Sequence, residues 1–175
     1  MLPILKPVRG DGDGWVLSAT GAMFWGRHGA AGLLLRAPLP DGTRAVLLQH
    51  RAAWSHLGGT WGLPGGARDS HETAEQTAVR EAHEEAGLAA EHVVVRAAVI
   101  TASVTATTSG SDWTYTTVVA DAPHPLDTVP NHESDELRWV AEEEVAELPL
   151  HPGFAASWRG LLELSRVTPL LQVPR

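Results

Sequence analysis

The chain has 175 residues, a formal net charge of −8 and no cysteine, with 43% hydrophobic and 19% charged residues. This composition indicates one globular domain of ordinary size and excludes disulfides, zinc–thiolate sites and a thiol nucleophile. The sequence has neither a long uncharged apolar run nor the apolar start of a signal peptide, so we expect a cytoplasmic protein with no membrane partner. The acidic charge argues against nucleic-acid polymers as partners. A phosphate ligand would need a divalent cation between its own negative charge and that of the protein.

We expect a single domain over residues 1–175, with a loose N-terminal arm over residues 1–14 and a C-terminal tail over residues 167–175. Strands are predicted where Val-, Ile-, Leu- or Thr-rich runs stand between turn residues, at 31–36, 45–49, 92–104, 113–119 and 136–140. A turn containing proline and glycine joins the first two as a hairpin. A glycine-rich loop over residues 58–66 follows, interrupted briefly around residues 61–63. Two helices are predicted late in the chain, at residues 141–146 and 154–165.

One further helix is predicted together with both of its ends. Thr73, followed by Gln76 three residues later, fits a capping box, so the helix begins after Thr73. Gly87 fits the left-handed residue that ends a helix. Alanines and Val79 recur between these ends at helical spacing and give a narrow apolar face. The sequence therefore predicts a mixed α/β protein in which this helix packs against strands.

Three carboxylates share one face of this helix, because Glu81, Glu84 and Glu85 stand at positions i, i+3 and i+4. Like charges at this spacing each cost roughly 0.2–0.5 kcal/mol, and a solvated acidic face is the ordinary alternative. Their place beside Gly65 and Gly66 favours a site for Mg²⁺, which prefers hard oxygen ligands and shares its coordination with substrate phosphates. The glycines permit a main-chain carbonyl to reach the same cation.

The residues around these carboxylates form a motif. In order they are Gly66, five residues, Glu72, seven residues and Arg80-Glu81-Ala82-His83-Glu84-Glu85-Ala86-Gly87-Leu88. We expect Arg80 to pair with Glu72 and to tie the loop to the helix. The pattern resembles the Nudix box, with every charged and glycine position present. Two positions depart from it, since Ala82 is small for its hydrophobic slot and His71 stands where family members often carry glycine.

The resemblance to Nudix hydrolases implies an α+β fold, with a mixed β-sheet sandwiched between helices, and hydrolysis of a diphosphate linkage. It also implies two or three Mg²⁺ ions with substrate bound, or Mn²⁺ in their place. Glu85 and Glu81 are then the leading metal ligands, with Glu84 in support and the Gly65 carbonyl completing the site. The remaining box positions take structural roles, namely Gly66, Glu72, Arg80 and Gly87.

Two positions outside the box match MutT-type members of the family. Arg51 has the spacing of a phosphate-binding arginine, the alternative being an ordinary arginine at a strand end. Glu133 has the place of a further metal ligand or base, with Glu136 as its competitor. The resemblance implies that Glu133 or Glu84 accepts a proton from the attacking water, while the cations and Arg51 stabilise the developing charge and no covalent intermediate forms.

The substrate is expected to be a nucleoside triphosphate. Secondary signatures of the ADP-ribose, dinucleoside polyphosphate, coenzyme A and NADH branches are absent, which leaves the MutT group and oxidised guanine nucleotides such as 8-oxo-dGTP. Trp54 and Trp61 either stack on the base or serve packing. His151 stands where guanine-reading members tend to hold asparagine, and Asn131 could supply an amide from another loop.

Two alternatives to this substrate are kept. The ligand could be another nucleoside diphosphate compound, such as ADP-ribose, a nucleotide sugar or a pyrimidine triphosphate. A Nudix-fold module that binds a nucleotide without cutting it is disfavoured, because such modules usually lose a glutamate of the box. In each case we expect a small-molecule nucleotide ligand and a monomer or homodimer.

Overall fold

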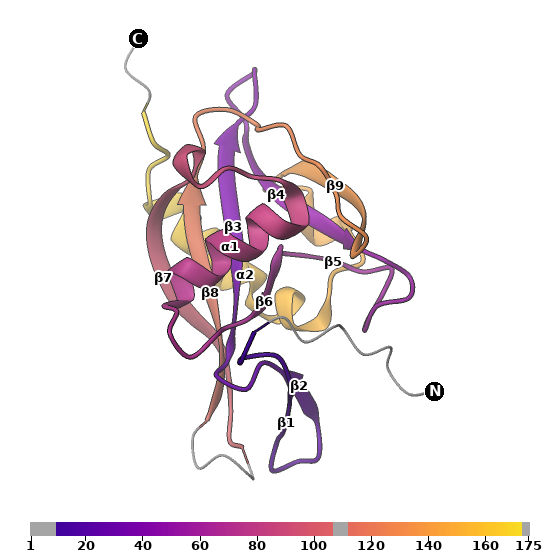
Figure 1. Ribbon diagram of the computed structural model, residues 1–175. Coiled ribbons are helices and arrows are strands. Elements are labelled where there is room, and N and C mark those ends of the chain that lie inside the picture. The colour runs from indigo at the N-terminus through magenta and orange to yellow at the C-terminus, as the bar shows by residue number, and fades with distance from the viewer. Residues whose placement is uncertain (1–9, 107–111, 173–175) are drawn as a thin grey trace.

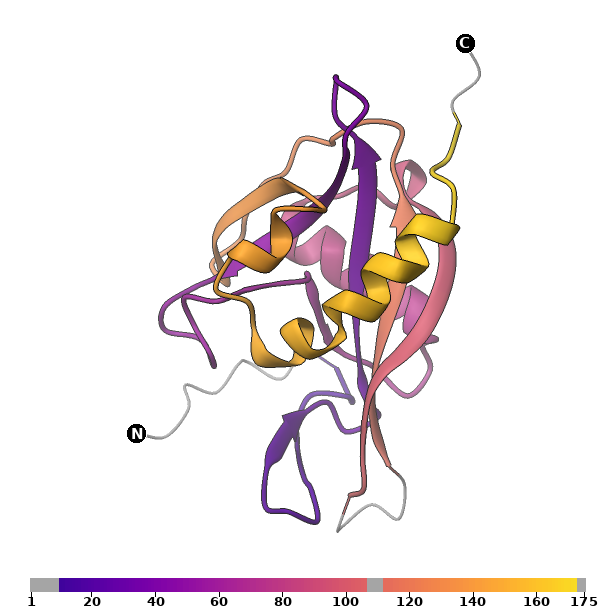
Figure 2. The same cartoon turned by 180° about the vertical axis from the view of Figure 1, so that it is seen from behind.

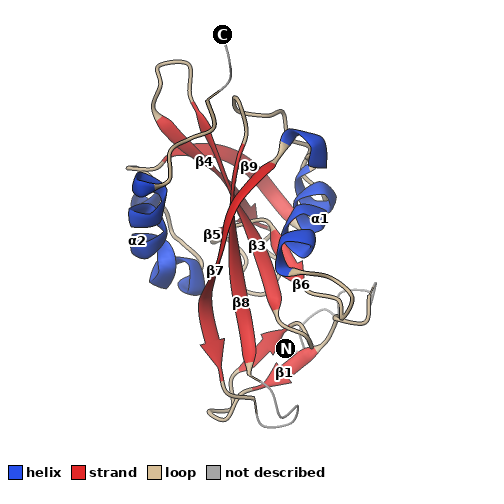
Figure 3. Cartoon of the chain, turned by 90° about the vertical axis from the view of Figure 1, so that its left-hand side faces the viewer, coloured by secondary structure: helices blue, strands red, loops and turns tan. Residues whose placement is uncertain are grey.

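The computed structural model describes residues 10–106 and 112–172. In this part of the chain a mixed β-sheet lies between two α-helices, one on each face (Figures 1 and 3). This arrangement confirms the predicted fold class. The strands of the sheet are β3 (Ala30–Pro38), β4 (Arg44–Arg51), β5 (Trp61–Gly62), β6 (Gly65–Ala67), β7 (Val94–Val104), β8 (Trp113–Asp121) and β9 (Ser134–Ala141).

Strand β3 is the centre of the sheet. The strand order is β5-β4-β3-β8-β7, with β6 paired to β3 and β9 paired to β4. β3 and β8 run parallel, whereas β3–β4, β7–β8 and β4–β9 are antiparallel. Because both faces of β3 are covered, Leu33, Leu34 and Leu35 are all buried. The five predicted strands are present, and the first two form the predicted hairpin.

Helices α1 (Ala74–Ala86) and α2 (Pro152–Val167) cover opposite faces of the sheet (Figures 2 and 3). α1 contributes Ala78, Ala82 and Ala86 to the core on its side, so its backbone can lie close to the strands. α2 packs through larger side chains, among them Phe154 and Trp158. No helix in the described residues is long and apolar enough to cross a membrane.

Both predicted ends of α1 are confirmed. Thr73 accepts a hydrogen bond from the Gln76 N–H, and the Gln76 side chain accepts one from the Thr73 N–H, which completes a capping box. Gly87 adopts the left-handed conformation at φ 69° and donates its N–H to the His83 carbonyl. The orientation of α1 is therefore set by local interactions at both termini.

The predicted α-helix at 141–146 is wrong. Ala141 ends β9, and a turn with a short 3₁₀ helix, η2 (Val145–Glu147), follows it. A single helical turn fixes several residues for few hydrogen bonds, and the buried Val145 holds the turn in place instead. In the predicted glycine-rich loop, the interruption around residues 61–63 is confirmed by β5, whereas the end of the loop belongs to β6. A second 3₁₀ helix, η1 (Ala90–His92), leads into β7.

A small hairpin precedes the main sheet, at the bottom of Figure 1. Its strands β1 (Trp15–Leu17) and β2 (Met23–Trp25) pair only with each other among the described strands. Of the predicted loose arm, residues 1–9 lie outside the described residues. Residues 10–14 are held in place, since the Gly12 N–H donates to Asp69 Oδ1 at 2.8 Å and Asp11 accepts from the Ser70 N–H at 2.9 Å.

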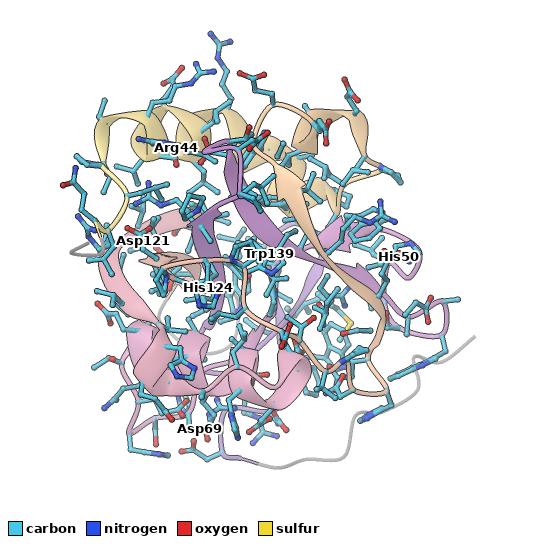
Figure 4. All side chains as sticks on the ribbon, turned by 90° about the horizontal axis from the view of Figure 1, so that it is seen from above. Arg44, His50, Asp69, Asp121, His124 and Trp139 are labelled. Atoms are coloured by element: carbon cyan, nitrogen blue, oxygen red, sulfur yellow. The ribbon has the colours of Figure 1, made fainter. Side chains whose placement is uncertain are left out.

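A buried polar network fastens α2 to the sheet. The side chains of Arg36 and Asp121 are fully buried and form a salt bridge, in which Arg36 Nε lies 2.7 Å from Asp121 Oδ1. Arg36 Nη1 also donates to the carbonyls of Ser165 and Thr168 at the end of α2, at 3.0 and 2.9 Å. Asp121 Oδ2 accepts from Arg96 at 2.9 Å. Figure 4 shows Asp121 in the layer between the two helices.

We expect Asp121→Ala to lower the free energy of unfolding by about 3–5 kcal/mol, because it leaves the buried Arg36 without its counter-ion. Urea unfolding followed by circular dichroism measures the change. Glu163→Ala is the matched control, since Glu163 faces Arg159 in an exposed i,i+4 pair and should change stability by less than about 0.5 kcal/mol. Equal effects of the two variants would contradict the role given to the buried network.

Candidate active site

Glu85 is the most deeply buried of the three carboxylates on α1, with 3% of the residue exposed. Its Oε2 accepts hydrogen bonds from the Gly65 N–H and from Gln49 Nε2, each at 3.0 Å. Gln49 Nε2 has a second proton and donates it to Ser134 Oγ at 2.8 Å. One side-chain amide on β4 therefore joins the helix carboxylate to the start of β9.

Arg80 offsets the repulsion between the other two carboxylates. Its Nη1 lies 2.8 Å from Glu81 Oε1 and 3.5 Å from Glu84 Oε1. Its Nε and Nη2 form the predicted pair with Glu72, at 2.6 and 2.9 Å, and Nη2 also donates to the Ala67 carbonyl. The bonds from Arg80 are the main reason why the pKa of Glu72 is lowered to about 2.

The backbone of β6 approaches these carboxylates directly. A Cβ built on Gly66 would lie 2.5 Å from the carboxylate of Glu81, and one on Gly65 would lie 2.5 Å from the Ala31 carbonyl oxygen. At Gly65 the backbone of β3 leaves no room for a side chain, whereas a side chain at Gly66 would displace the Glu81 carboxylate. Two carboxylates, Glu81 and Glu85, thus converge on a main-chain segment, and this set of hard oxygen donors suits Mg²⁺.

The loop before β9 lies against the end of α1. Asn131 Nδ2 donates to the Glu84 carbonyl at 3.2 Å, and Asn131 Oδ1 accepts from the Glu133 N–H at 2.9 Å. The Glu133 carbonyl in turn accepts from the Ala52 N–H at 2.9 Å. The amide of Asn131 is therefore engaged in placing Glu133, whose side chain is 15% exposed.

Arg51, His56 and His151 lie in one region beside the carboxylates. Arg51 Nε donates to the His56 carbonyl at 3.1 Å, and the charges of Arg51 and His56 both act on His151 at the start of α2. Tyr115 on β8 faces the same region. Burial raises the pKa of its hydroxyl. The negative charge of Glu85 raises this pKa further, and the positive charge of Arg51 lowers it. Tyr115 therefore lies near both the carboxylates and the arginine.

His151 is the N-cap of α2. Its Nδ1 accepts from the Gly153 N–H at 3.1 Å, and Pro152 occupies the first helical position. An acceptor at Nδ1 requires the neutral imidazole. Burial, followed by the charges of Arg51 and His56, lowers the pKa of His151 to about 4. The cap is therefore uncharged at neutral pH.

The two tryptophans singled out in the sequence have different surroundings. Trp61 is 5% exposed. The His50 ring and the Arg138 guanidinium each lie 4.7 Å from its ring centroid. Trp61 is therefore better placed for packing in the protein than for stacking on a base. Trp54 is 43% exposed and stacks on His132 at 5.8 Å. Figure 4 shows His50 at the edge of the molecule, away from α1.

A separate acidic group lies on the loop that leads to α1. Asp11, Asp69 and His71 place one potential ligand atom each within 4.8 Å of one another. The two aspartates already accept hydrogen bonds from the N–H groups of Ser70 and Gly12. This group therefore holds the N-terminal segment on the loop. Asp69 is visible below α1 in Figure 4.

The sequence pattern of the NUDIX domain matches residues 26–159. The chain belongs to the NUDIX domain family. It is accordingly a hydrolase of phosphoric anhydride bonds, in the family whose members generally use divalent metal ions. The matched region contains the whole box together with Arg51, Glu133 and His151, and it begins one residue after β2.

Relatives and solved structures agree with this membership. The chain is 72% identical to "Putative 8-oxo-dGTP diphosphatase 3" of Mycobacterium tuberculosis, over 94% of this chain and 76% of the relative. The crystal structure of the Nudix hydrolase RenU from M. smegmatis is 68% identical and superimposes with a TM-score of 0.89, over 93% of this chain and all of that one. A C. elegans Ap4A hydrolase shares the fold, with 22% identity and a TM-score of 0.60 over 77% and 95% of the two chains.

Four residues near this Nudix site were not predicted from the sequence, namely Gln49, His56, Tyr115 and Trp15, whose ring lies 5.9 Å from that of His56. Gln49 reaches Glu85 across 36 positions of the chain, and such a contact leaves no local signal. Trp15 could have been found, because it and Trp25 lie on either side of the turn residues Thr20 and Gly21, a spacing typical of a short hairpin.

We expect Glu72→Gln to destabilise the protein by about 1–3 kcal/mol at pH 7, because it weakens the two charged hydrogen bonds between the Arg80 guanidinium and the Glu72 carboxylate. The Glu72 carboxyl has its pKa lowered from 4.5 to about 2, so its contribution is full above pH 4.5 and is lost as the pH falls towards 2. Thermal melts of both proteins across this range check the prediction. A gap in Tm that stays constant down to pH 2 would contradict it.

His151 should make the folded state sensitive to acid. Its pKa is lowered from 6.5 to about 4, so its stabilising contribution is present above pH 6.5 and is lost as the pH falls from 6.5 to 4. His151→Asn keeps an N-cap acceptor without a titrating group. We expect the Tm of the wild type to fall more steeply than that of the variant over this interval, measured by differential scanning fluorimetry. Parallel curves would refute this assignment.

Proposed function

We propose that this chain is a magnesium-dependent nucleoside triphosphate pyrophosphohydrolase of the MutT type, releasing a nucleoside monophosphate and pyrophosphate. Oxidised guanine nucleotides such as 8-oxo-dGTP are its proposed substrates, and the cytoplasm is its proposed location. The observation that carries the proposal is the convergence of Glu81 and Glu85 on the backbone of β6. The name of the M. tuberculosis relative supports the choice of substrate.

In this proposal Glu81 and Glu85 are the leading ligands of Mg²⁺, and Mn²⁺ can replace it. Glu84, the Gly65 carbonyl and Glu133 complete a site for two or three ions. When bound, the ions supply Lewis-acid polarisation of the bridging phosphates. One of these donors, Glu85, is held in place by hydrogen bonds of 3.0 Å from Gly65 and Gln49.

The side chains of the protein then bind the phosphates and accept the proton. Arg51 binds the phosphates and stabilises the charge that develops on them. Glu133 accepts the proton of the attacking water, with Glu84 as the alternative. The oxygen of water bonds to the β-phosphorus, and the bond from that phosphorus to the α,β-bridging oxygen breaks, so the nucleoside monophosphate leaves without a covalent enzyme intermediate. Glu133 is favoured over Glu136 because Asn131 accepts from the Glu133 N–H and donates to the Glu84 carbonyl, which places Glu133 beside α1.

We expect hydrolysis of 8-oxo-dGTP in Mg²⁺ well ahead of dGTP, dCTP, ADP-ribose and diadenosine polyphosphate. Anion exchange separates pyrophosphate from orthophosphate and thereby identifies the anhydride bond that is cleaved. Glu85→Gln should lower kcat at least about a hundredfold, since it removes a charge that stabilises the transition state through the cation.

Glu75→Gln provides the matched control, because it makes the same substitution in the first turn of the same helix and should leave kcat within about twofold. A preference for another member of the panel would replace the proposed substrate and keep the reaction. An absence of cleavage with both Mg²⁺ and Mn²⁺ would overturn the proposed function.

A further inference from the structure

The β1–β2 hairpin is fixed to the domain along one of its two faces. Val16 is buried and forms a small core with Ala30 and Trp113, against which Phe24 packs. Side chains alternate between the faces of a strand, so Trp15 and Trp25 point away from this core. The inner face of the hairpin therefore accounts for its attachment, and the outer face carries two half-buried tryptophans without a packing role in that core.

The two outer tryptophans form a single aromatic unit. Trp15 and Trp25 are opposite each other in the strand register, and their rings meet edge to face at 5.1 Å and 74°. The Trp25 carbonyl accepts a hydrogen bond from Trp113 Nε1 at 3.2 Å, which fixes the outer pair relative to the core. The indoles are thus held in place by the protein before any ligand arrives.

This aromatic unit reaches the arginine region of the site. The ring of Trp15 lies 5.9 Å from that of His56 at an angle of 77°. The His56 carbonyl accepts from Arg51 Nε at 3.1 Å, and the charges of both residues act on His151. A planar, partly exposed surface therefore stands beside the side chain proposed to bind phosphates.

We infer that Trp15, together with His56, forms an aromatic wall of the substrate pocket and selects for a purine base. This inference rests on the proposed function, because it takes Arg51 as the phosphate-binding residue. A base is attached to the phosphates through a sugar, so its binding surface must stand a short distance from Arg51. Trp15 meets this condition through His56, whose ring it contacts and whose carbonyl Arg51 binds. Purines present a larger flat surface than pyrimidines and gain more from stacking.

Binding of hydrolysis-resistant α,β-methylene analogues of dGTP and dCTP, measured by calorimetry in Mg²⁺, tests the wall without requiring cleavage. Trp15→Leu keeps apolar volume and removes the aromatic face, so we expect the dissociation constant for the dGTP analogue to rise roughly tenfold, within the range of base–aromatic stacking. The constant for the dCTP analogue should rise less. Trp15→Phe should retain most of the affinity and the purine preference.

Met23→Ala is the matched control, because Met23 is 55% exposed at the far end of β2 on the same face as Trp25, and it should leave both constants unchanged. Thermal melts establish that all variants are folded. An unchanged constant in Trp15→Leu, an equal loss for both analogues, or an equal loss in the Phe and Leu variants would overturn the inference. If the wild type bound the analogues as expected but cut no nucleotide, the proposed function would be overturned and the inference about Trp15 would stand.

Discussion

Mutual repulsion between three carboxylates on one helix face is the constraint around which the site is built. The donors that offset it come from different elements, with Arg80 on α1 itself, Gln49 on β4 and the Gly65 N–H on β6. The helix must therefore lie where all of these donors reach it. Its alanine face permits this position, because larger side chains would hold the helix further from the sheet.

The end of α1 extends the same constraint to a second loop. Val129 donates its N–H to the Ala86 carbonyl, and Asn131 donates to the Glu84 carbonyl, so the loop supplies partners that the last turn of a helix lacks. The same Asn131 positions Glu133. The carboxylates of the helix and the carboxylate of the loop are consequently parts of one hydrogen-bonded assembly, although they are far apart in the sequence.

Features set by local interactions could be predicted from the sequence, and those set by distant contacts could not. The limits of α1 follow from Thr73, Gln76 and Gly87, all within or beside the helix. The Nudix box also reveals the pairing of Arg80 with Glu72, because the motif contains both partners. By contrast, the position of His151 beside Arg51 depends on how α2 returns to the sheet, which no short pattern records. The hairpin strands, of three residues each, are too short for an alternating pattern to stand out.

The capping role of His151 limits how the neighbourhood of the arginine can change during evolution. A replacement must still accept a hydrogen bond from the first turn of α2, which leaves mainly Asn, Asp, Ser and Thr. Each of these is shorter than histidine, and one carries a negative charge. A lineage that altered ligand preference at this position would therefore have to do so within a small and polar set of side chains, whereas Trp15, on a β-strand, caps no helix and is free of that restriction.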